Sequence, residues 1–308
     1  MGITIVTYHY VREIQNSSYP KIRGLEFSGF QRQLDYLSKK YQIISANDLI
    51  EYIRGGNSTL PENSCLLTFD DGFKDHVENV VPELKRRGLT GCFFPTAGPI
   101  VEERVLDVHA IHFILACCDN ITTLVSDLKD ECRKVGFTES DIADLWANAA
   151  LANRFDPGEV IFVKRLLQRD LPEEFRSSIT KTLFERYVGK SQNEFSRELY
   201  MSQSDVKDLV THGMYVGSHG YYHYFLDSID ARKQELEIDR SLQFLSDVGA
   251  STSDWIMCYP YGAYDYRTLD ILVNRKCIAG VTTKAGIASL DSENALELSR
   301  FDTTDFPQ

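Results

Sequence analysis

Long apolar runs and positive charge are both scarce in this sequence. No stretch reaches the roughly 18 consecutive apolar residues of a membrane-spanning helix, and the first residues lack the basic leader and apolar segment of a secretory signal. The 33 Lys and Arg are outnumbered by 45 Asp and Glu, which gives a formal net charge of -12. This balance argues against nucleic acid or an anionic membrane as a partner. We therefore predict a cytoplasmic protein with no transmembrane segment and no nucleic-acid partner.

The cysteine pattern argues against a disulfide framework. The chain has seven cysteines, an odd number, with no C-x-x-C pair, and several of them lie inside apolar runs. Their spacings match no zinc–thiolate pattern. Reduced and mostly buried thiols are the expected state, as is typical of the cytoplasm. At 308 residues and 43% hydrophobic composition, the chain has enough material for one large domain or two ordinary ones.

Strand-like and helix-like segments alternate in residues 1–100 and 200–308. Short β-branched runs such as "ITIVTYH" and "CLLTF" alternate with helical periodicity, and Ser45 with Asp48 predicts a capped helix start. This alternation predicts an α/β fold with βαβ units and a parallel sheet or barrel. Residues 101–199 carry apolar spacing of i, i+3, i+4 with hardly any strand signal. We interpret them as an all-α insertion or cap.

Two adjacent carboxylates, Asp70 and Asp71, follow the predicted strand "CLLTF" and precede a glycine. The carboxyl ends of parallel strands are where α/β barrels place their catalytic groups. Successive strand residues point to opposite sides, so one aspartate can face a metal while the other faces substrate. The alternative is a pair that caps the helix predicted over 73–87.

His219 and His223 form an H-x-x-x-H pair after a second apolar strand. Two imidazoles and one carboxylate are a recurrent ligand set for zinc or another divalent ion, with one position left open for water. The alternative is two ordinary, partly exposed histidines near a turn. A third strand leads into Tyr259–Gly262, a turn whose backbone N–H groups are candidate oxyanion donors, although P-Y-G turns are also common without a function.

Three segments, "LLTFDDGF", "VGSHGYYH" and "CYPYGAYD", occur in this order and resemble the motifs of polysaccharide deacetylases of the NodB-homology type, carbohydrate esterase family 4. The resemblance covers residues 1–100 and 200–308, not the helical middle. It implies a distorted (β/α) barrel of about seven repeats. The implied cofactor is a divalent metal ion, with zinc expected. The implied roles are metal ligands Asp71, His219 and His223, general base Asp70, and a backbone oxyanion donor at Tyr261.

The chain departs from the family pattern at two functional positions. No histidine follows His223, so the usual late general acid is missing, and Cys258 with Tyr259 stands where an arginine is expected. His9, at the end of the first strand, is our candidate general acid, since an ordinary histidine pKa suits proton donation. A supporting role for His9 is the alternative. Arg300 is the candidate to orient Asp70. Three further residues are expected to contact substrate: Pro260, Tyr222 and Tyr264.

The resulting functional hypothesis is a metal-dependent hydrolase that removes an N-acetyl group from an amino sugar. A cytoplasmic location favours a precursor or oligosaccharide of bacterial surface polysaccharide, and the insertion would then restrict substrate size. Two alternatives stay open. One is hydrolysis of a non-sugar amide on the same fold. The other is a catalytically silent carbohydrate-binding relative, suggested by the missing late histidine and arginine.

Overall fold

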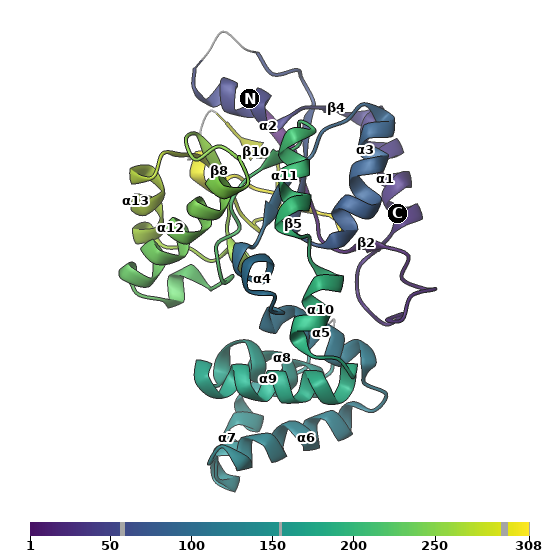
Figure 1. Cartoon of the computed structure of the whole chain (residues 1–308), viewed down its shortest axis with the longest axis vertical. Coiled ribbons are helices and arrows are strands. Elements are labelled where there is room, and N and C mark those ends of the chain that lie inside the picture. Colours follow the sequence, from purple (N-terminus) through teal and green to yellow (C-terminus); the bar gives the residue numbers. More distant parts are fainter. Residues whose placement is uncertain (56–58, 154–155, 291–294, 308) are drawn as a thin grey trace. The chain divides into compact units, whose positions relative to one another are not determined.

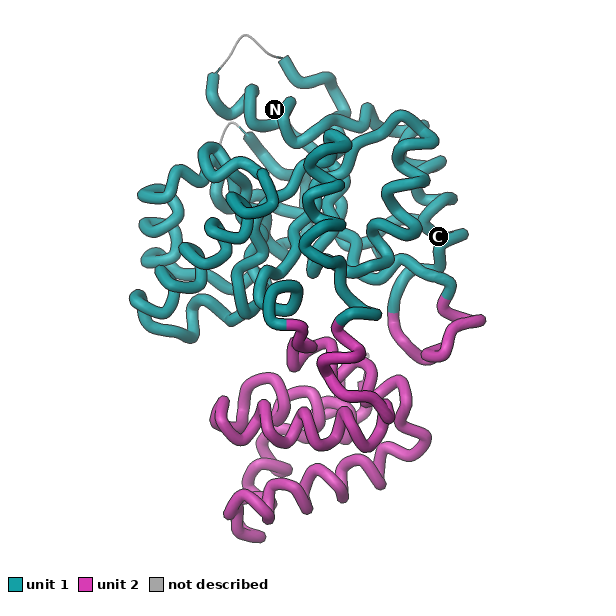
Figure 2. Tube along the Cα trace, in the orientation of Figure 1, with its two compact units in different colours: residues 1–13, 24–102, 197–308 teal, residues 14–23, 103–196 magenta. Residues whose placement is uncertain are grey.

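The computed structural model describes residues 1–55, 59–153, 156–290 and 295–307. The chain divides into two compact units (Figure 2). Unit 1 comprises residues 1–13, 24–102 and 197–308, and unit 2 comprises residues 14–23 and 103–196. Among the described residues, no helix has both the length and the apolar character needed to cross a membrane.

Unit 1 is built on a seven-stranded, largely parallel sheet (Figure 1). Its central strand order is β10-β1-β5-β6-β7, with β11 pairing with β1 and β4 pairing with β5. β10 is the antiparallel member. The strands are β1 (Gly2–Tyr8), β4 (Gln42–Ile43), β5 (Ser64–Asp71), β6 (Cys92–Pro95), β7 (Tyr215–Val216), β10 (Ala288–Ser289) and β11 (Phe301–Asp302).

Two smaller parallel pairs complete the described strands of unit 1. They are β2 (Val11–Arg12) with β3 (Leu25–Glu26), and β8 (Trp255–Cys258) with β9 (Cys277–Val281). A single bridge between Ser218 and Met257 connects the segment after β7 to β8. The α/β class is therefore confirmed. The described ladders form separate sheets and do not close, so the barrel of about seven repeats stays a prediction.

Helices connect these strands in the sequence order that βαβ units require. Ser45 and Asp48 form the predicted capping box at the start of α2, which confirms that helix start. α12 packs beside α13 (Figure 1). The helices are α1 (Phe27–Lys40), α2 (Ala46–Ile53), a π-helix (His76–Val80), α3 (Val81–Arg87), α4 (Ala97–Glu102), α11 (Gln203–Thr211), α12 (Ala231–Asp247) and α13 (Tyr266–Asn274), with single 3-10 turns at Leu226–Ser228, Pro260–Gly262, Ala295–Glu297 and Thr303–Asp305.

The core of unit 1 holds β5 rigidly, since every residue of this strand is buried. Such a strand, covered on both faces, is typical of parallel sheets. Phe69 lies between the rings of Tyr8 on β1 and Phe93 on β6, with centroid separations of 5.1 and 4.8 Å. This stack fixes the neighbouring strands close to their carboxyl ends, where Asp70 and Asp71 follow.

Unit 2 is helical, and no strand occurs among its described residues. Phe113 and Phe184 each contact Phe195 in its aromatic core, and Tyr19 from the segment 14–23 joins them at 5.0 Å from Phe113. The helices are α5 (Asp107–Cys117), α6 (Ile121–Lys134), α7 (Glu139–Ala149), α8 (Gly158–Arg165), a π-helix (Leu166–Asp170), α9 (Glu173–Val188) and α10 (Gln192–Leu199), the last of which ends in unit 1.

Candidate active site

The end of β5 bends sharply at two successive left-handed residues. Asp71 has φ 72° and Gly72 has φ 74°. A side chain on Gly72 would come within 2.8 Å of Pro95 Cβ, so this position requires glycine. Aspartate is one of the few other residues that tolerate a positive φ. The bend ends the strand and separates the surroundings of Asp71 from those of Asp70.

The structure brings Asp71, His219 and His223 together in unit 1. Asp71 Oδ1 lies 3.4 Å from His219 Nε2 and 3.5 Å from His223 Nε2, and the two Nε2 atoms are 3.1 Å apart. All three residues are buried. His219 and His223 belong to the segment after β7, in which Gly220 and His223 have φ of 73° and 62°. This segment reverses direction, and both imidazoles face the end of β5.

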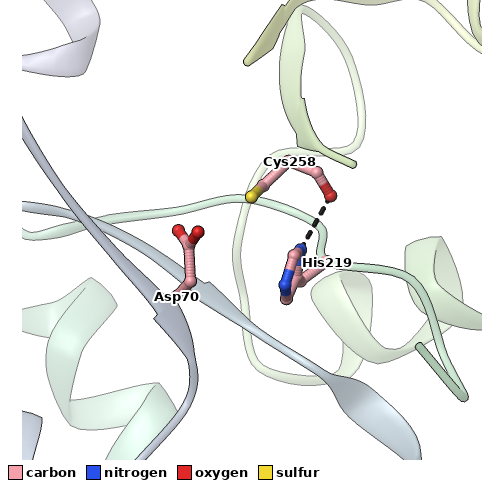
Figure 3. A group of neighbouring side chains, drawn as sticks. All are labelled: Asp70, His219 and Cys258. Carbon is pink, nitrogen blue, oxygen red and sulfur yellow. Dashed lines mark hydrogen bonds between the residues drawn. The ribbon is translucent and has the colours of Figure 1, made fainter. Parts of the chain in front are cut away.

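The donor set fits a divalent cation. His219 Nδ1 lies 2.8 Å from the carbonyl oxygen of Cys258, so Nδ1 carries the proton and donates it (Figure 3). The neighbouring Cys258 and the hydrogen bond to Asp71 outweigh burial and raise the pKa of His219. A bound cation would take the place of the second proton, on Nε2, which faces the other two ligand atoms. Around a tetrahedral zinc ion with bonds of about 2.0–2.1 Å, neighbouring ligand atoms are about 3.3–3.4 Å apart. The three observed separations match that spacing.

A second cluster, Asp70 with His219 and Cys258, also has its ligand atoms within 4.8 Å of one another (Figure 3). It suits a metal less well. Burial raises the pKa of the Cys258 thiol, which therefore stays protonated. Asp70 is already bonded to Arg300 at 2.9 Å and to the Thr7 hydroxyl at 3.1 Å. The first cluster is therefore the candidate metal centre, and Asp70 stands beside it.

Asp70 is held in its ionised form. Burial alone would raise the pKa of this carboxyl group, but the Arg300 guanidinium, with smaller contributions from His219 and His9, brings the pKa below its ordinary value. Both Asp70 and Arg300 are buried. The Arg300 Nε atom donates to the backbone carbonyl of Thr282 at 2.9 Å, which fixes the orientation of the guanidinium. Asp70 is therefore a carboxylate anion whose orientation is fixed by the Arg300 guanidinium.

Replacing Arg300 with methionine should destabilise the protein by about 3–5 kcal/mol, because it leaves the Asp70 carboxylate buried without its cation. Urea unfolding measures this loss. The double variant Asp70→Asn/Arg300→Met should recover part of it, since the uncompensated charge is removed. Single-variant losses that simply add in the double variant would contradict a direct ion pair.

His9 approaches Asp70 from the solvent side. Its Nε2 lies 3.9 Å from Asp70 Oδ2, and 46% of its side chain is exposed. The backbone carbonyl of His9 accepts a hydrogen bond at 2.9 Å from Nε2 of His76, a fully buried residue at the start of the π-helix. Burial lowers the pKa of His76 to about 4, so this ring is neutral and donates from Nε2. His76, which the sequence analysis did not select, thus supports the backbone that carries His9.

The neutral state of His76 predicts a specific loss of stability in acid. The unfolded histidine binds a proton near its ordinary pKa of 6.5 and the folded one only near 4. Between these values the unfolded state binds more protons, so stability falls as pH falls, by about 3 kcal/mol in total. His76→Gln keeps an N–H donor for His9 and removes the titration. Metal-free wild type and variant should therefore differ in the slope of unfolding free energy from pH 6.5 to 4; parallel curves would contradict the assignment.

The turn after β8 contacts the metal-ligand candidates through Tyr261. This residue has φ 58°, its ring stacks on Phe225 at 3.7 Å, and it meets the His223 ring at 4.4 Å. Pro260 begins the turn and is buried. The turn therefore places the Tyr261 ring against His223, and donation from the Tyr261 backbone N–H to an oxyanion stays a prediction.

The two predicted substrate tyrosines make other contacts. The Tyr222 hydroxyl donates to Glu102 at 2.7 Å. The Tyr264 hydroxyl donates to Glu297 at 2.8 Å, and its ring stacks on Tyr259. Both side chains are only partly buried. Each is therefore oriented by a carboxylate, and a role in binding substrate stays a prediction.

Sequence reasoning missed three supporting groups besides His76. Thr7 bonds Asp70, the Cys258 carbonyl orients His219, and Glu237 accepts backbone N–H groups from the loop that carries His223. Thr7 lies on β1, two residues before His9, and could have been found from that position. A backbone carbonyl carries no sequence signal, and Glu237 is one of many charged residues of an amphipathic helix.

Comparisons with known proteins bear on the family and the fold. A polysaccharide deacetylase family model matches residues 170–276, a range that includes both histidines and the Pro260 turn but not Asp70 or Asp71. No match was found among curated proteins. The resemblance to polysaccharide deacetylases, first indicated by three short motifs, is thus confirmed by a family match.

Several solved structures share the fold. The deacetylase PplD of Streptococcus pyogenes, in complex with acetate, has 17% identity and a TM-score of 0.59, with 98% of this chain and 92% of that chain covered. IcaB from Ammonifex degensii has 19% identity and a TM-score of 0.56, with coverages of 97% and 90%. The BpsB deacetylase domain from Bordetella bronchiseptica has 13% identity and a TM-score of 0.55, with coverages of 98% and 95%. At these identities the likeness concerns the fold.

Proposed function

We propose that this chain, which matches the polysaccharide deacetylase family model over residues 170–276, is a metal-dependent hydrolase that removes the N-acetyl group of an amino sugar. One observation carries the proposal. Three metal-ligating side chains, Asp71, His219 and His223, converge in unit 1, beside a separate carboxylate, Asp70, that is kept ionised by Arg300. A ligand set next to an independent base is the arrangement that hydrolysis of an amide by water requires.

Each side chain then has a distinct role in the reaction. A divalent cation, with zinc expected, would be held by Asp71, His219 and His223 and would supply Lewis acidity toward the amide carbonyl and a lowered pKa for water. Asp70 accepts the proton of the attacking water, and Arg300 keeps this carboxylate ionised and oriented.

The remaining groups act on the oxyanion and the leaving group. The backbone N–H of Tyr261 donates to the oxyanion that forms when water adds to the carbonyl carbon. As the C–N bond breaks, His9 donates a proton to the departing nitrogen, and the products are acetate and the free amine. The 3.9 Å separation of His9 and Asp70 supports a proton donor next to the base.

The substrate we propose is a precursor or oligosaccharide of bacterial surface polysaccharide. Pro260, Tyr222 and Tyr264 are the residues proposed to contact its sugar rings, since partly exposed tyrosine faces suit that contact. The proposed boundaries of the deacetylase fold are 1–100 with 200–308, and the helical segment 101–199 is proposed to restrict substrate length. Acetate release from N-acetylated sugars of increasing length tests this restriction.

The decisive functional test is an acetate-release screen on nucleotide-linked, lipid-linked and oligomeric N-acetyl sugars. The protein is first stripped of metal and then supplied with Zn²⁺ or Co²⁺. We expect acetate from at least one class of sugar, only after metal is added, and none from Asp70→Asn. Metal-dependent ring opening of small cyclic amides without acetate release would instead indicate a non-sugar amidase. Sugar binding without turnover would indicate a silent relative.

A further inference from the structure

Glu237 of α12 is a buried carboxylate that serves the loop carrying His223. The side chain is 3% exposed, and no ion pair joins it to any residue in the described part of the chain. Its Oε1 accepts hydrogen bonds from the backbone N–H groups of Tyr221 at 2.9 Å and Tyr222 at 2.5 Å. Burial raises the pKa of Glu237 to about 7, and the backbone N–H groups of the loop, those of His223 and Tyr224 included, act against this rise by favouring the charged form. Because this buried side chain has only backbone N–H groups as partners among the described residues, the loop backbone must follow a defined path for those groups to reach it.

The loop is shaped to surround this one oxygen. Gly220 has φ 73° and His223 has φ 62°, and such left-handed residues turn consecutive N–H groups toward a common point, as in an anion-binding nest. A Cβ at position 220 would lie 3.0 Å from Glu237 Oε1, so the close approach of the carboxylate and the positive φ both require glycine there. The backbone nest of this loop is therefore occupied by a side chain of the same protein, Glu237.

The same loop sets the position of a metal-ligand candidate. Residues 219–224 contain no helix or strand, and besides Glu237 their path is held at the start of α4, where the Gly98 N–H donates to the Tyr221 carbonyl at 2.7 Å. His219 is oriented separately, by the Cys258 carbonyl. The His223 Nε2, which lies 3.1 Å from the His219 Nε2, depends on the turn that Glu237 organises. The two imidazoles are thus oriented by two independent supports.

We propose that Glu237 is a positioning residue that holds His223 in the geometry for cation binding, by serving as the internal hydrogen-bond acceptor of the nest formed by the backbone of residues 221–224. The inference rests on the proposed metal-dependent function. Loss of partners that orient a metal ligand typically weakens metal affinity by about 10–100-fold. A purely structural role would lower stability and leave affinity unchanged.

The test measures Zn²⁺ and Co²⁺ binding to the metal-free full chain by calorimetry, together with the visible absorption of bound Co²⁺, which reports its coordination. Glu237→Gln keeps the shape and one acceptor, and Glu237→Ala removes both. Gln234→Ala is the matched control, because Gln234 is an equally buried residue of α12 that bonds the Leu226 carbonyl, outside the nest.

Expected results distinguish the possible roles. Glu237→Gln should weaken affinity for the cation by about 10-fold and Glu237→Ala by up to about 100-fold, with an altered Co²⁺ spectrum, while Gln234→Ala loses stability at unchanged affinity. Glu237→Asp should recover part of the affinity. If both Glu237 variants bind as wild type does, the inference is wrong although the metal centre stands. If wild type itself binds no cation, the proposed function fails. Should Glu237→Ala not fold, the glutamine variant still decides.

Discussion

The Asp70→Asn protein should bind its cation as wild type does but release acetate about 10²–10⁴-fold more slowly, because the asparagine keeps the shape of the side chain and cannot accept a proton from water. Asp70 lies beside the Asp–His cluster of Asp71, His219 and His223. It accepts hydrogen bonds from Arg300 and Thr7. The deficit should therefore fall on kcat, with metal affinity nearly unchanged. Steady-state acetate release and calorimetric metal titration on the same preparation measure the two effects.

Asp75 offers a matched control for this experiment. It follows the same strand, is buried, and pairs with Arg12 at 2.7 Å, as Asp70 pairs with Arg300. Asp75→Asn should lose stability as Asp70→Asn does, because each variant disturbs a buried ion pair. It should nevertheless keep kcat within about threefold of wild type, because Asp75 touches none of the reacting groups. Equal losses of kcat in both variants would mean that folding, and not proton transfer, explains the Asp70 result.

Removing one ligand of the candidate centre should abolish activity by a different route. His223→Ala or Asp71→Asn should weaken Zn²⁺ affinity by more than about 100-fold, beyond the effect expected for a group that only orients a ligand. Activity at limiting metal should fall to background. The physical reason is that each of the three side chains would supply one of only three protein bonds to the cation. Their ligand atoms already lie 3.1 to 3.5 Å from one another, so the loss of one is not made up by the others.

The second histidine pair of the chain controls for this result. His109 and His112 lie on α5 with ring centroids 6.0 Å apart, and neither belongs to the Asp–His cluster. His112→Ala should leave metal affinity and acetate release unchanged. Stoichiometric Zn²⁺ binding that is kept in His223→Ala and lost in His112→Ala would place the cation in unit 2 and contradict the assignment.

Much of the candidate site could be anticipated from where polar residues follow apolar runs. Parallel strands bring their carboxyl ends to one edge, so side chains distant in sequence, such as Asp71 and His219, were expected to be neighbours. Arg300 was selected because an arginine was missing elsewhere, and the structure places it 2.9 Å from Asp70. Local signals, such as the Ser45 capping box, follow from a few adjacent residues and are correspondingly easy to predict.

The supporting groups could not be anticipated, because they depend on tertiary approach. The proton on His219 Nδ1 is directed by a backbone carbonyl that every residue possesses. Glu237 acts through amides 13 to 16 residues away in sequence, and only folding brings α12 to them. The closed barrel was inferred by resemblance, whereas ladder formation depends on strand register, which short runs such as β7 specify weakly.

The most direct test of the account is anomalous X-ray diffraction at the zinc absorption edge from crystals of the zinc-loaded protein. The account predicts one strong anomalous peak bonded to Asp71 Oδ1, His219 Nε2 and His223 Nε2, with Asp70 outside the bonding distance of about 2.0–2.2 Å. A peak on Asp70 and Cys258, on the helical unit, or absent altogether would contradict it.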